Sequence, residues 1–285
     1  MILVSGATGY LGGIIVRTLL TQGCKLRALV RVDSDYSAIA DAGAECVLGD
    51  LKDDESLRRA CEGVESIVTT ANSAQRGGND NAETVDLKGN HKLIDAARDA
   101  GVRQFVFVSA YGASTSHPVP FLQAKARTEE YLRSSGLSYT ILSPHIFMDV
   151  WIPIVVGSAL QEQRPVVLLG QGERKHSFIA VTDVAAFAVG SVGNDRALNQ
   201  QLVLGGPEAV SWRDIIVMTE KAVGRPIAVQ TTSAGAAVPP LPEFILGLLA
   251  GMEMGDVIIP MEETASAFGV VLTSPEQFVR RAFGR

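Results

Sequence analysis

The sequence predicts an α/β fold built on a doubly wound parallel sheet, and two observations carry this prediction. Through the first half of the chain, short apolar and β-branched segments alternate with helical patterns, the order expected when helices cover both faces of a parallel sheet. Each of these helical patterns is followed by a glycine, which readily adopts the left-handed backbone that ends a helix. The helix-ending glycines are Gly23, Gly43, Gly63, Gly101 and Gly136.

Six segments are the expected strands of this sheet, and the pattern changes after Pro144. The strands are expected at residues 2–5, 26–31, 46–48, 67–70, 105–109 and 140–142. Beyond Pro144 the chain shows strands at 166–169, 177–180 and 201–204, and helices that begin near residues 182, 211 and 274. Ser211 with Asp214, and Ser274 with Gln277, have the spacing of helix-capping pairs.

We expect two domains. Residues 1–149 form the doubly wound domain, and residues 150–285 mostly form a smaller α+β domain for a substrate or a partner, with some segments (about 177–205) returning to the first sheet. Segment 234–242 is rich in alanine and proline and is expected to be a linker or a lid loop. The apolar segment 244–252 is too short to cross a bilayer and is expected to be a core or interface helix.

Length and composition restrict the class of protein. With 285 residues, 47% of them hydrophobic, the chain can bury a large core. Its three cysteines are widely spaced, which favours reduced thiols, and without zinc-ligand spacing we expect no metal. The net charge of −6, without a run of Lys and Arg, argues against nucleic acid as a partner. Because the first strand begins at residue 2 and no apolar stretch reaches membrane-spanning length, we expect a cytoplasmic protein without a membrane segment.

A glycine-rich loop joins the first expected strand to the first helix. It has the pattern Gly-x-x-Gly-x-x-Gly, in which the first glycine permits a tight turn, the second admits a pyrophosphate and the third lets helix and strand pack closely. The N-terminus of the following helix supplies N–H groups for the phosphates. A chain with 28 glycines contains such spacings by chance, so the position at the first strand–helix junction is what indicates a dinucleotide site. The loop residues are Gly6, Ala7, Thr8, Gly9, Tyr10, Leu11 and Gly12.

The end of the second strand indicates which dinucleotide binds. An acidic residue there would accept a hydrogen bond from the ribose 2′-hydroxyl of NAD(H), whereas an arginine can pair with the 2′-phosphate of NADP(H). The strand ends at Arg31, so NADP(H) is the preferred cofactor. Asp33 lies close by, which keeps NAD(H) possible, and Arg31 is alternatively a solvated charge at a strand end.

Two further strand ends supply candidate cofactor contacts. After the third strand, Asp50 can accept a hydrogen bond from the adenine amino group while Leu51 packs against the ring, although Asp50 is also suited to capping a turn. The fourth strand ends in the small and polar residues Thr70, Ala71 and Asn72, where a dinucleotide crosses the carboxyl edge of the sheet.

With these features and the segments 105–112 and 125–142, the chain resembles the atypical short-chain dehydrogenase/reductases, specifically the NmrA-like branch of these NAD(P)-binding Rossmann proteins. Segments 176–185 and 204–208 are similar to signatures of that branch's substrate domain, so the resemblance covers nearly the whole chain. It implies that the first domain holds a nicotinamide cofactor and that the second domain takes part in binding the substrate.

The resemblance also implies a catalytic centre, and the chain departs from it. The family usually joins a Ser or Thr after strand five to a Tyr-x-x-x-Lys helix, whose phenol is the general acid and whose lysine lowers the phenol pKa and holds the ribose. Ser109 and Lys125 match this pattern, but Phe121 stands where the tyrosine is expected. Some similar proteins keep the lysine alone, and others have lost catalysis and only sense NADP. Catalysis is therefore left open, with a reductase favoured.

Other residues are candidates for the same region. Tyr111 follows strand five and is a candidate catalytic residue, unless it only lines the pocket. The resemblance places Pro144 and His145 beside the nicotinamide carboxamide, whereas His117 is expected in a surface turn. Four apolar residues are candidates for a substrate pocket, although such residues lie more often in a core. They are Phe121, Phe147, Met148 and Trp151.

Three functions remain open. The leading hypothesis is an NADP(H)-dependent oxidoreductase that transfers hydride to a small apolar or aromatic electrophile, such as a quinone or an enone, because such an acceptor stabilises its own anion. The second is a non-catalytic NADP(H)-binding redox sensor or assembly factor with a protein partner at 234–252. The third and weaker one is an NAD-dependent epimerase or isomerase of nucleotide sugars, against which Arg31 and Phe121 count.

Overall fold

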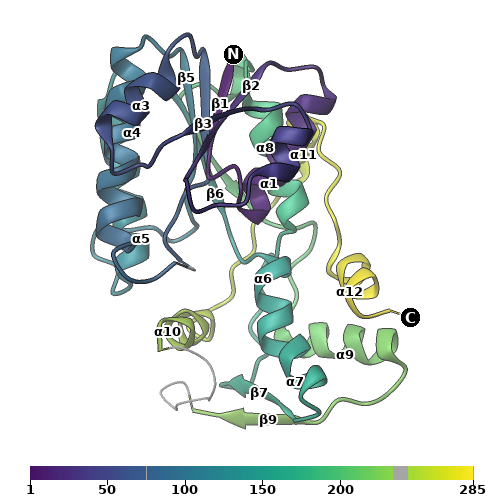
Figure 1. The fold of residues 1–285 in the computed structure, drawn as a ribbon. Coiled ribbons are helices and arrows are strands. Elements are labelled where there is room, and N and C mark those ends of the chain that lie inside the picture. The colour runs from purple at the N-terminus through teal and green to yellow at the C-terminus, as the bar shows by residue number, and fades with distance from the viewer. Residues whose placement is uncertain (75, 234–242, 285) are drawn as a thin grey trace. The chain divides into compact units, whose positions relative to one another are not determined.

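The computed structural model describes residues 1–74, 76–233 and 243–284 of the chain. The chain divides into two compact units (Figure 1). The first consists of Met1–Ser143 together with Val184–Leu202, and the second of Pro144–Asp183 together with Val203–Arg285.

A seven-stranded sheet with the order β3-β2-β1-β4-β5-β6-β8 forms the centre of the first unit. Neighbouring strands from β3 to β6 in this order all pair in parallel, which confirms the predicted doubly wound fold. The strand order reverses between β1 and β4, and this is the place where α/β proteins of this class bind their ligands. The strands are β1 (Ile2–Ser5), β2 (Leu26–Val30), β3 (Glu45–Leu48), β4 (Ser66–Thr69), β5 (Gln104–Val108), β6 (Ser138–Pro144) and β8 (Gln200–Leu204).

Helices cover both faces of this sheet. In Figure 1, α3, α4 and α5 lie on one face, and α1 and α8 lie on the other. The five predicted helix-ending glycines all have a positive φ, between 69° and 101°, which confirms their role. The helices are α1 (Tyr10–Thr21), α2 (Ser37–Asp41), α3 (Asp54–Cys61), the π-helix η1 (Ala82–Gly89), α4 (Asn90–Asp99), α5 (Pro120–Ser134), α8 (Val181–Ser191) and the 3₁₀-helix η3 (Asp195–Ala197).

The core of the first unit follows from the register of its strands. Leu3 pairs with Ile67 and Ile67 pairs with Phe105, so that three large side chains lie in one row across the sheet. All three are fully buried and belong to one apolar cluster. Burying each such side chain contributes roughly 1.5–3 kcal/mol to folding. This row therefore holds together the strands whose ends carry the glycine loop.

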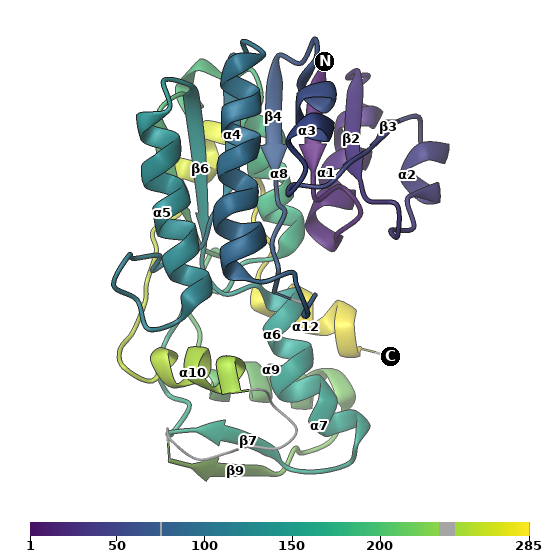
Figure 2. The ribbon, with the colours of Figure 1, turned by 60° about the vertical axis from the view of Figure 1, so that its left-hand side comes forward.

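The second unit combines helices with the small parallel sheet of β7 and β9, which lie side by side in Figure 2. Both predicted capping pairs are present, because Ser211 with Asp214 and Ser274 with Gln277 form reciprocal capping boxes. The elements are α6 (Met148–Ile152), the π-helix η2 (Pro153–Gly157), α7 (Ser158–Gln161), β7 (Val166–Leu169), α9 (Trp212–Val223), β9 (Val229–Thr232), α10 (Glu243–Met252), α11 (Glu262–Phe268) and α12 (Pro275–Phe283).

The structure corrects the predicted strand at 177–180. This segment is extended, but within the described residues it and the adjacent His176 make only isolated bridges, between Phe147 and Ile179 and from His176 to Val210 and Val257. Its side chains pack into the core of the second unit, so an apolar extended segment occurs without a continuous strand partner. The expected linker or lid loop at 234–242 lies outside the described residues. None of the helices in the described part of the chain has both the length and the apolar character required to cross a membrane.

Candidate functional site

The glycine loop has a backbone that excludes larger residues. Gly6 has a φ of +78°, and its carbonyl accepts a hydrogen bond from the N–H of Gly9 at 3.0 Å. A Cβ on Gly12 would lie 2.0 Å from that same carbonyl oxygen. The first and third glycines of the pattern are therefore required by the positive φ and by the close contact between the loop and α1.

The loop leads into the N-terminus of α1, which is suited to an anion. Gly9 is the N-cap, no side chain caps the helix, and its first turn carries no acidic residue. N–H groups at such a helix end attract phosphate. Beside the loop is a pocket of about 190 Å³, which Arg17, Asp35 and Tyr36 also line. The N-terminus of α1, this pocket, and the two glycines at which a Cβ would collide with other atoms, Gly6 and Gly12, fit the phosphates of a dinucleotide. Arg17 was not a predicted site residue.

The residues expected at the adenine have structural roles of their own. One carboxylate oxygen of Asp50 accepts a hydrogen bond from the backbone N–H of Lys52 at 2.8 Å, so this side chain shapes the turn after β3. Leu51 is buried, and a Cβ on Gly89 would lie only 2.9 Å from its Cβ. The turn is therefore packed against η1. A contact of Asp50 or Leu51 with adenine stays a prediction.

The end of β4 packs directly against the glycine loop. The hydroxyl of Thr70 lies 3.3 Å from the carbonyl oxygen of Gly6, and Ala71 is buried. The side chain of Asn72 donates to the carbonyl of Thr70 and accepts from the backbone N–H of Ala74. These residues form the carboxyl edge of the sheet at the strand-order reversal, where they were expected to lie.

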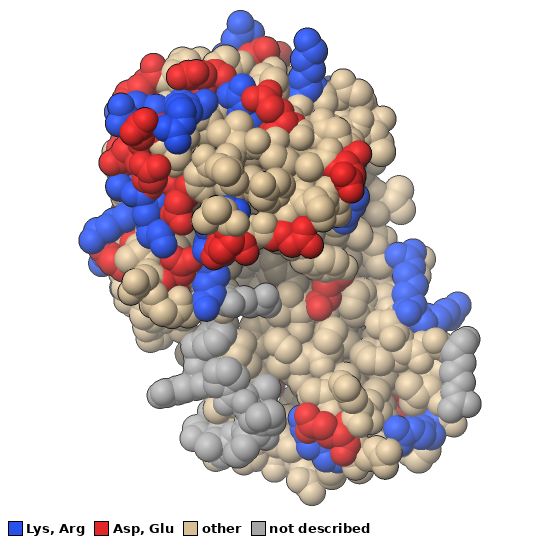
Figure 3. Space-filling view, viewed as in Figure 1, with Lys and Arg blue, Asp and Glu red and all other residues tan. Residues whose placement is uncertain are grey.

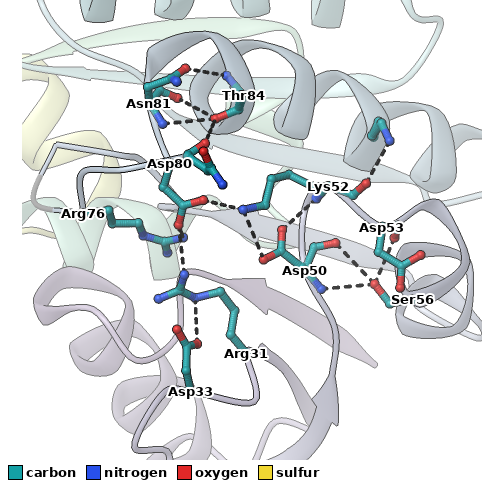
Figure 4. Close-up of polar contacts among 12 residues, drawn as sticks. Arg31, Asp33, Asp50, Lys52, Asp53, Ser56, Arg76, Asp80, Asn81 and Thr84 are labelled. Atoms are coloured by element: carbon teal, nitrogen blue, oxygen red, sulfur yellow. Dashed lines mark hydrogen bonds and ion pairs between the residues drawn. The ribbon is translucent and has the colours of Figure 1, made fainter.

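Three cationic side chains converge on Asp80, as Figure 4 shows. Arg31, at the end of β2, donates to one carboxylate oxygen at 2.9 Å, and Arg76 donates to the same oxygen at 3.3 Å. Lys52, which follows β3, donates to the other oxygen. Asp80 is only 10% exposed, whereas the exposed fractions of the three cationic side chains lie between 29% and 40%.

Two further carboxylates lie at the edge of this charged cluster. Asp33 is 3.5 Å from Arg31, and Asp50 is 3.8 Å from Lys52. The hydrogen bond between Lys52 and Asp80 raises the pKa of the lysine and lowers the pKa of the carboxylate. Arg31, Asp33 and Asp50 were predicted from the sequence, whereas Lys52, Arg76 and Asp80 were not, although Lys52 directly follows the predicted motif of Asp50 and Leu51. Charges elsewhere on the first unit are mixed, as the face in Figure 3 shows.

The predicted catalytic lysine lies in a closed environment. Its side chain is 3% exposed, its ammonium donates to the carbonyl of Val108 at 3.1 Å, and it lies 3.5 Å from Asp86, which is fully buried. Burial lowers the pKa of Lys125, while Asp86 acts in the opposite direction. The ammonium also lies 4.9 Å from the ring centroid of Phe107 and 5.3 Å from that of Phe121, within range of cation–π attraction.

The hydroxyl of Ser109 is also engaged. It donates to the buried carboxylate of Glu129, which also accepts from Arg133 at 3.0 Å and from Gln201 at 3.3 Å. Glu129 therefore pairs with Ser109 and Arg133. Asp86 is the functional residue that sequence reasoning missed here, because nothing in the sequence links it to a lysine 39 positions away.

Asp86 also connects the lysine to the segment after β4. One of its oxygens accepts hydrogen bonds from the backbone N–H of Ser73 at 3.0 Å and from its hydroxyl at 2.6 Å. The other oxygen accepts no hydrogen bond from the described residues and faces the ammonium of Lys125. The lysine is therefore the compensating charge for a buried carboxylate.

In the second unit, His145 and His176 form a pair. Nε2 of His145 lies 3.3 Å from Nδ1 of His176, and Nε2 of His176 lies 2.9 Å from the carbonyl oxygen of Met252 in α10. Because a carbonyl only accepts, His176 donates from Nε2. In its neutral form His176 then accepts a hydrogen bond at Nδ1 from Nε2 of His145. Burial, followed by repulsion from His176, lowers the pKa of His145 to about 3, and burial also lowers the pKa of His176.

This pair makes stability depend on pH. A histidine whose folded pKa is about 3 and whose ordinary pKa is 6.5 stays neutral in the fold while the unfolded chain takes up a proton. Its contribution is present above pH 6.5 and is lost as the pH falls from there towards 3. Between pH 7 and pH 5 we expect His145 to account for a loss of about 2 kcal/mol in the free energy of unfolding. Urea unfolding at both pH values, compared with His145→Asn, checks this; an equal loss in the variant contradicts it.

The other predicted site residues have diverse environments. Tyr111 is 39% exposed, and His117 accepts a hydrogen bond from the backbone N–H of Val119 at its Nδ1, as a turn residue would. Pro144 is buried at the end of β6. Met148 is fully buried in the apolar core of the second unit, whereas Phe147 and Trp151 are half-buried. A substrate pocket lined by these side chains stays a prediction.

The strand order, the glycine loop and the arginine at the end of β2 define an NAD(P)-binding protein of the Rossmann class. A family model described as NAD(P)H-binding matches residues 6–195, and the chain belongs to this family. Membership confirms the NAD(P)-binding Rossmann family that the sequence predicted, and it makes NAD(P)H the cofactor.

Known proteins similar to this chain have different activities. The chain is 34% identical to the photosystem II assembly factor Ycf39 of Cyanophora paradoxa, over 79% of this chain and 69% of that protein. It is 29% identical to an NAD(P)H azoreductase of Xenophilus azovorans, over 80% of this chain and 75% of that protein. The solved structure of an NADPH-dependent quinone oxidoreductase of Escherichia coli, complexed with NADPH, covers all of both chains with a TM-score of 0.84 and 24% identity, a likeness of fold.

Proposed function

We propose that this protein is an NADPH-dependent reductase that passes a hydride to a small apolar or aromatic electrophile, such as a quinone, an enone or an azo dye. The observation that carries the proposal is the environment of Lys125. Its ammonium faces Asp86 and lies beside the ring of Phe121, which stands where the family's general acid is expected. The reaction therefore has to proceed without the usual phenol.

Proton supply decides which acceptors are suitable. Reducing a simple ketone produces an alkoxide, which needs a proton from a positioned acid, and such an acid contributes roughly 10²–10⁴-fold to the rate. Ser109 donates its hydroxyl proton to Glu129, and the side chain of Lys125 is only 3% exposed between Val108 and Asp86, so neither group is placed as a general acid for a ketone. The bound nicotinamide supplies the hydride. An acceptor whose anion is delocalised can take its proton from water afterwards, and quinones and enones have this property.

Two of the similar proteins support this choice of acceptor. One is named an azoreductase and the other a quinone oxidoreductase, and both names describe acceptors with delocalised electrons. The preference for NADPH is supported by Arg31, whose guanidinium lies in a cluster with Lys52 and Arg76.

The test compares the rates of NADPH oxidation with quinones and with ketones, in the wild type and in Phe121→Tyr. We expect the wild type to oxidise NADPH with quinones and to reduce simple ketones at least about 100-fold more slowly. Placing a phenol beside Lys125 should leave quinone reduction nearly unchanged and should raise the rate with ketones relative to quinones by about tenfold or more. Initial rates of NADPH oxidation at 340 nm measure both.

The matched control for Phe121→Tyr is a second substitution of phenylalanine by tyrosine. Phe278→Tyr adds the same hydroxyl to a half-buried phenylalanine of α12 and should leave the ratio of the two rates unchanged. The proposal is wrong if the wild type reduces ketones as fast as quinones. It is also wrong if protein that binds NADPH transfers no hydride to any quinone, enone or azo dye.

A second candidate function is favoured by a different observation. The 34% identity to a photosystem II assembly factor supports a non-catalytic NADP(H)-binding protein with a protein partner. The sequence predicts such a partner at 234–252, of which 234–242 lies outside the described residues and α10 begins at Glu243. This candidate predicts similar affinity for NADP⁺ and NADPH in calorimetry, no turnover, and a partner recovered by a pull-down that a deletion of 243–252 abolishes.

A further inference from the structure

The charged cluster around Asp80 resembles an anion-binding site in which a carboxylate of the chain itself takes the place of the bound anion. Arg31 and Arg76 share one oxygen of Asp80, and Lys52 holds the other. These cations come from three separate segments, after β2, β3 and β4, yet all of them contact one carboxylate (Figure 4). A phosphate ester carries about −1.5 to −2 charges and three acceptor oxygens, so the same three donors suit it better than a carboxylate.

Backbone hydrogen bonds before and after Asp80 in the sequence fix its position. Its N–H donates to the carbonyl of Gly77 at 3.2 Å, and Gly77 and Gly78 have φ values of +80° and +62°, which form a tight turn. The next residue, Asn81, caps η1 by accepting from the N–H groups of Glu83 and Thr84, each at 3.0 Å. The position of Asp80 is thus determined by a turn and a helix cap, and does not depend only on its ion pairs.

The charges of the cluster determine how Asp80 affects the binding of another anion. Three acidic side chains, Asp33, Asp50 and Asp80, face the three cations, so the cluster is neutral as it stands. An incoming phosphate would meet a buried carboxylate of the same sign, and would gain the three cations only once that carboxylate has moved. The local charge without Asp80 is positive.

We propose that Asp80 is a residue that determines the specificity for NADP(H) or NAD(H). This inference rests on the proposed use of NADPH. Its carboxylate competes with the 2′-phosphate of NADP(H) for Arg31, Lys52 and Arg76. The phosphate site is complete only when the side chain of Asp80 has turned away. Asp80 therefore weakens the binding of NADP(H) and leaves the binding of NAD(H), which has no phosphate at this position, unaffected.

The test is cofactor affinity in Asp80→Asn, which keeps the shape of the side chain and removes its charge. We expect the Kd for NADPH and for 2′,5′-ADP to fall by about tenfold. This factor applies if the carboxylate of Asp80 leaves the phosphate site of the wild type about one tenth of the time. The Kd for NADH and for 5′-AMP should stay unchanged. Calorimetry or quenching of intrinsic fluorescence measures all four ligands without any turnover.

Glu83→Gln is the matched control. It removes one negative charge from the same part of the chain, but its carboxylate pairs with Lys88 at 3.0 Å and does not belong to the cluster. It should leave all four affinities nearly unchanged. If Asp80→Asn does not fold, Asp80→Ser is measured in the same way.

Three results would overturn the inference. Unchanged or weaker binding of NADPH in the Asp80 variant excludes competition. Weaker binding of NADH shows instead that Asp80 holds the ribose 2′-hydroxyl. An equal gain in the affinity for NADPH in Glu83→Gln shows that the effect comes from the net charge of the protein alone. Each is a binding result, so it is distinguishable from a failure of the proposed reductase activity, which is measured as NADPH oxidation.

Discussion

Replacing Gly12 by valine is expected to weaken the binding of NADPH by more than about 100-fold, equivalent to roughly 2.7 kcal/mol. The reason is steric: a Cβ at this position would lie 2.0 Å from the carbonyl oxygen of Gly6 and 2.7 Å from its carbonyl carbon. Both obstructing atoms belong to the backbone, so the loop has to move away from α1. The N–H groups at the start of the helix then no longer point at a common phosphate.

Gly13→Ala is the control for this expectation. A Cβ on Gly13 would have as its nearest neighbour the Nη1 atom of Arg17, 3.3 Å away at the end of a flexible side chain. We expect the affinity of this variant to stay within about threefold of the wild type. Fluorescence titration with NADPH, with circular dichroism to verify folding, measures both variants. A folded Gly12→Val protein that binds NADPH normally would contradict the described loop geometry.

The second large effect is expected from Lys125→Met. Removing one partner from a buried ion pair leaves the other charge uncompensated, which typically costs 3–5 kcal/mol. Here the remaining partner is Asp86, which is fully buried and has one oxygen that accepts no hydrogen bond from the described residues. We therefore expect the free energy of unfolding, measured with urea at pH 7, to fall by about 3 kcal/mol or more.

A double variant separates lost charge from lost packing. In Lys125→Met with Asp86→Asn, no buried charge is left without a partner, so at least about half of the lost stability should return. Lys88→Met removes a lysine from η1 whose side chain is 65% exposed, and its loss should be below about 1 kcal/mol. If the double variant is no more stable than Lys125→Met, the ion pair is not the source of the effect.

Local signals were sufficient to predict most of the fold. Left-handed glycines such as Gly23 and Gly101, and the reciprocal cap of Ser211 with Asp214, act within a few residues, so they can be read in one sequence. The segment 177–180 shows where this ends. It is apolar and extended like a strand, but whether a neighbour runs alongside it depends on residues far away in the chain, such as Val210.

The same distinction applies to the candidate site. Gly6 and Gly12 were predicted because a spacing and a strand–helix junction identify them. Asp80 and Asp86 were not, because their importance comes from Arg31 and Lys125, which are 49 and 39 positions away. Lys125 itself was predicted as a ribose neighbour, but its burial beside Asp86 is visible only once the chain has folded.

The central position of β1 has a consequence for how the protein folds. The strand that carries the glycine loop pairs with β2 and, on its other side, with β4, where Ile2 lies opposite Ser66. The loop is completed only when Thr70 and Ala71, at the end of β4, pack against it. Such pairing between distant segments is slow compared with the formation of single helices. Competence to bind NADPH should therefore appear late in refolding, after most of the helical signal, and can serve as a marker of the completed fold.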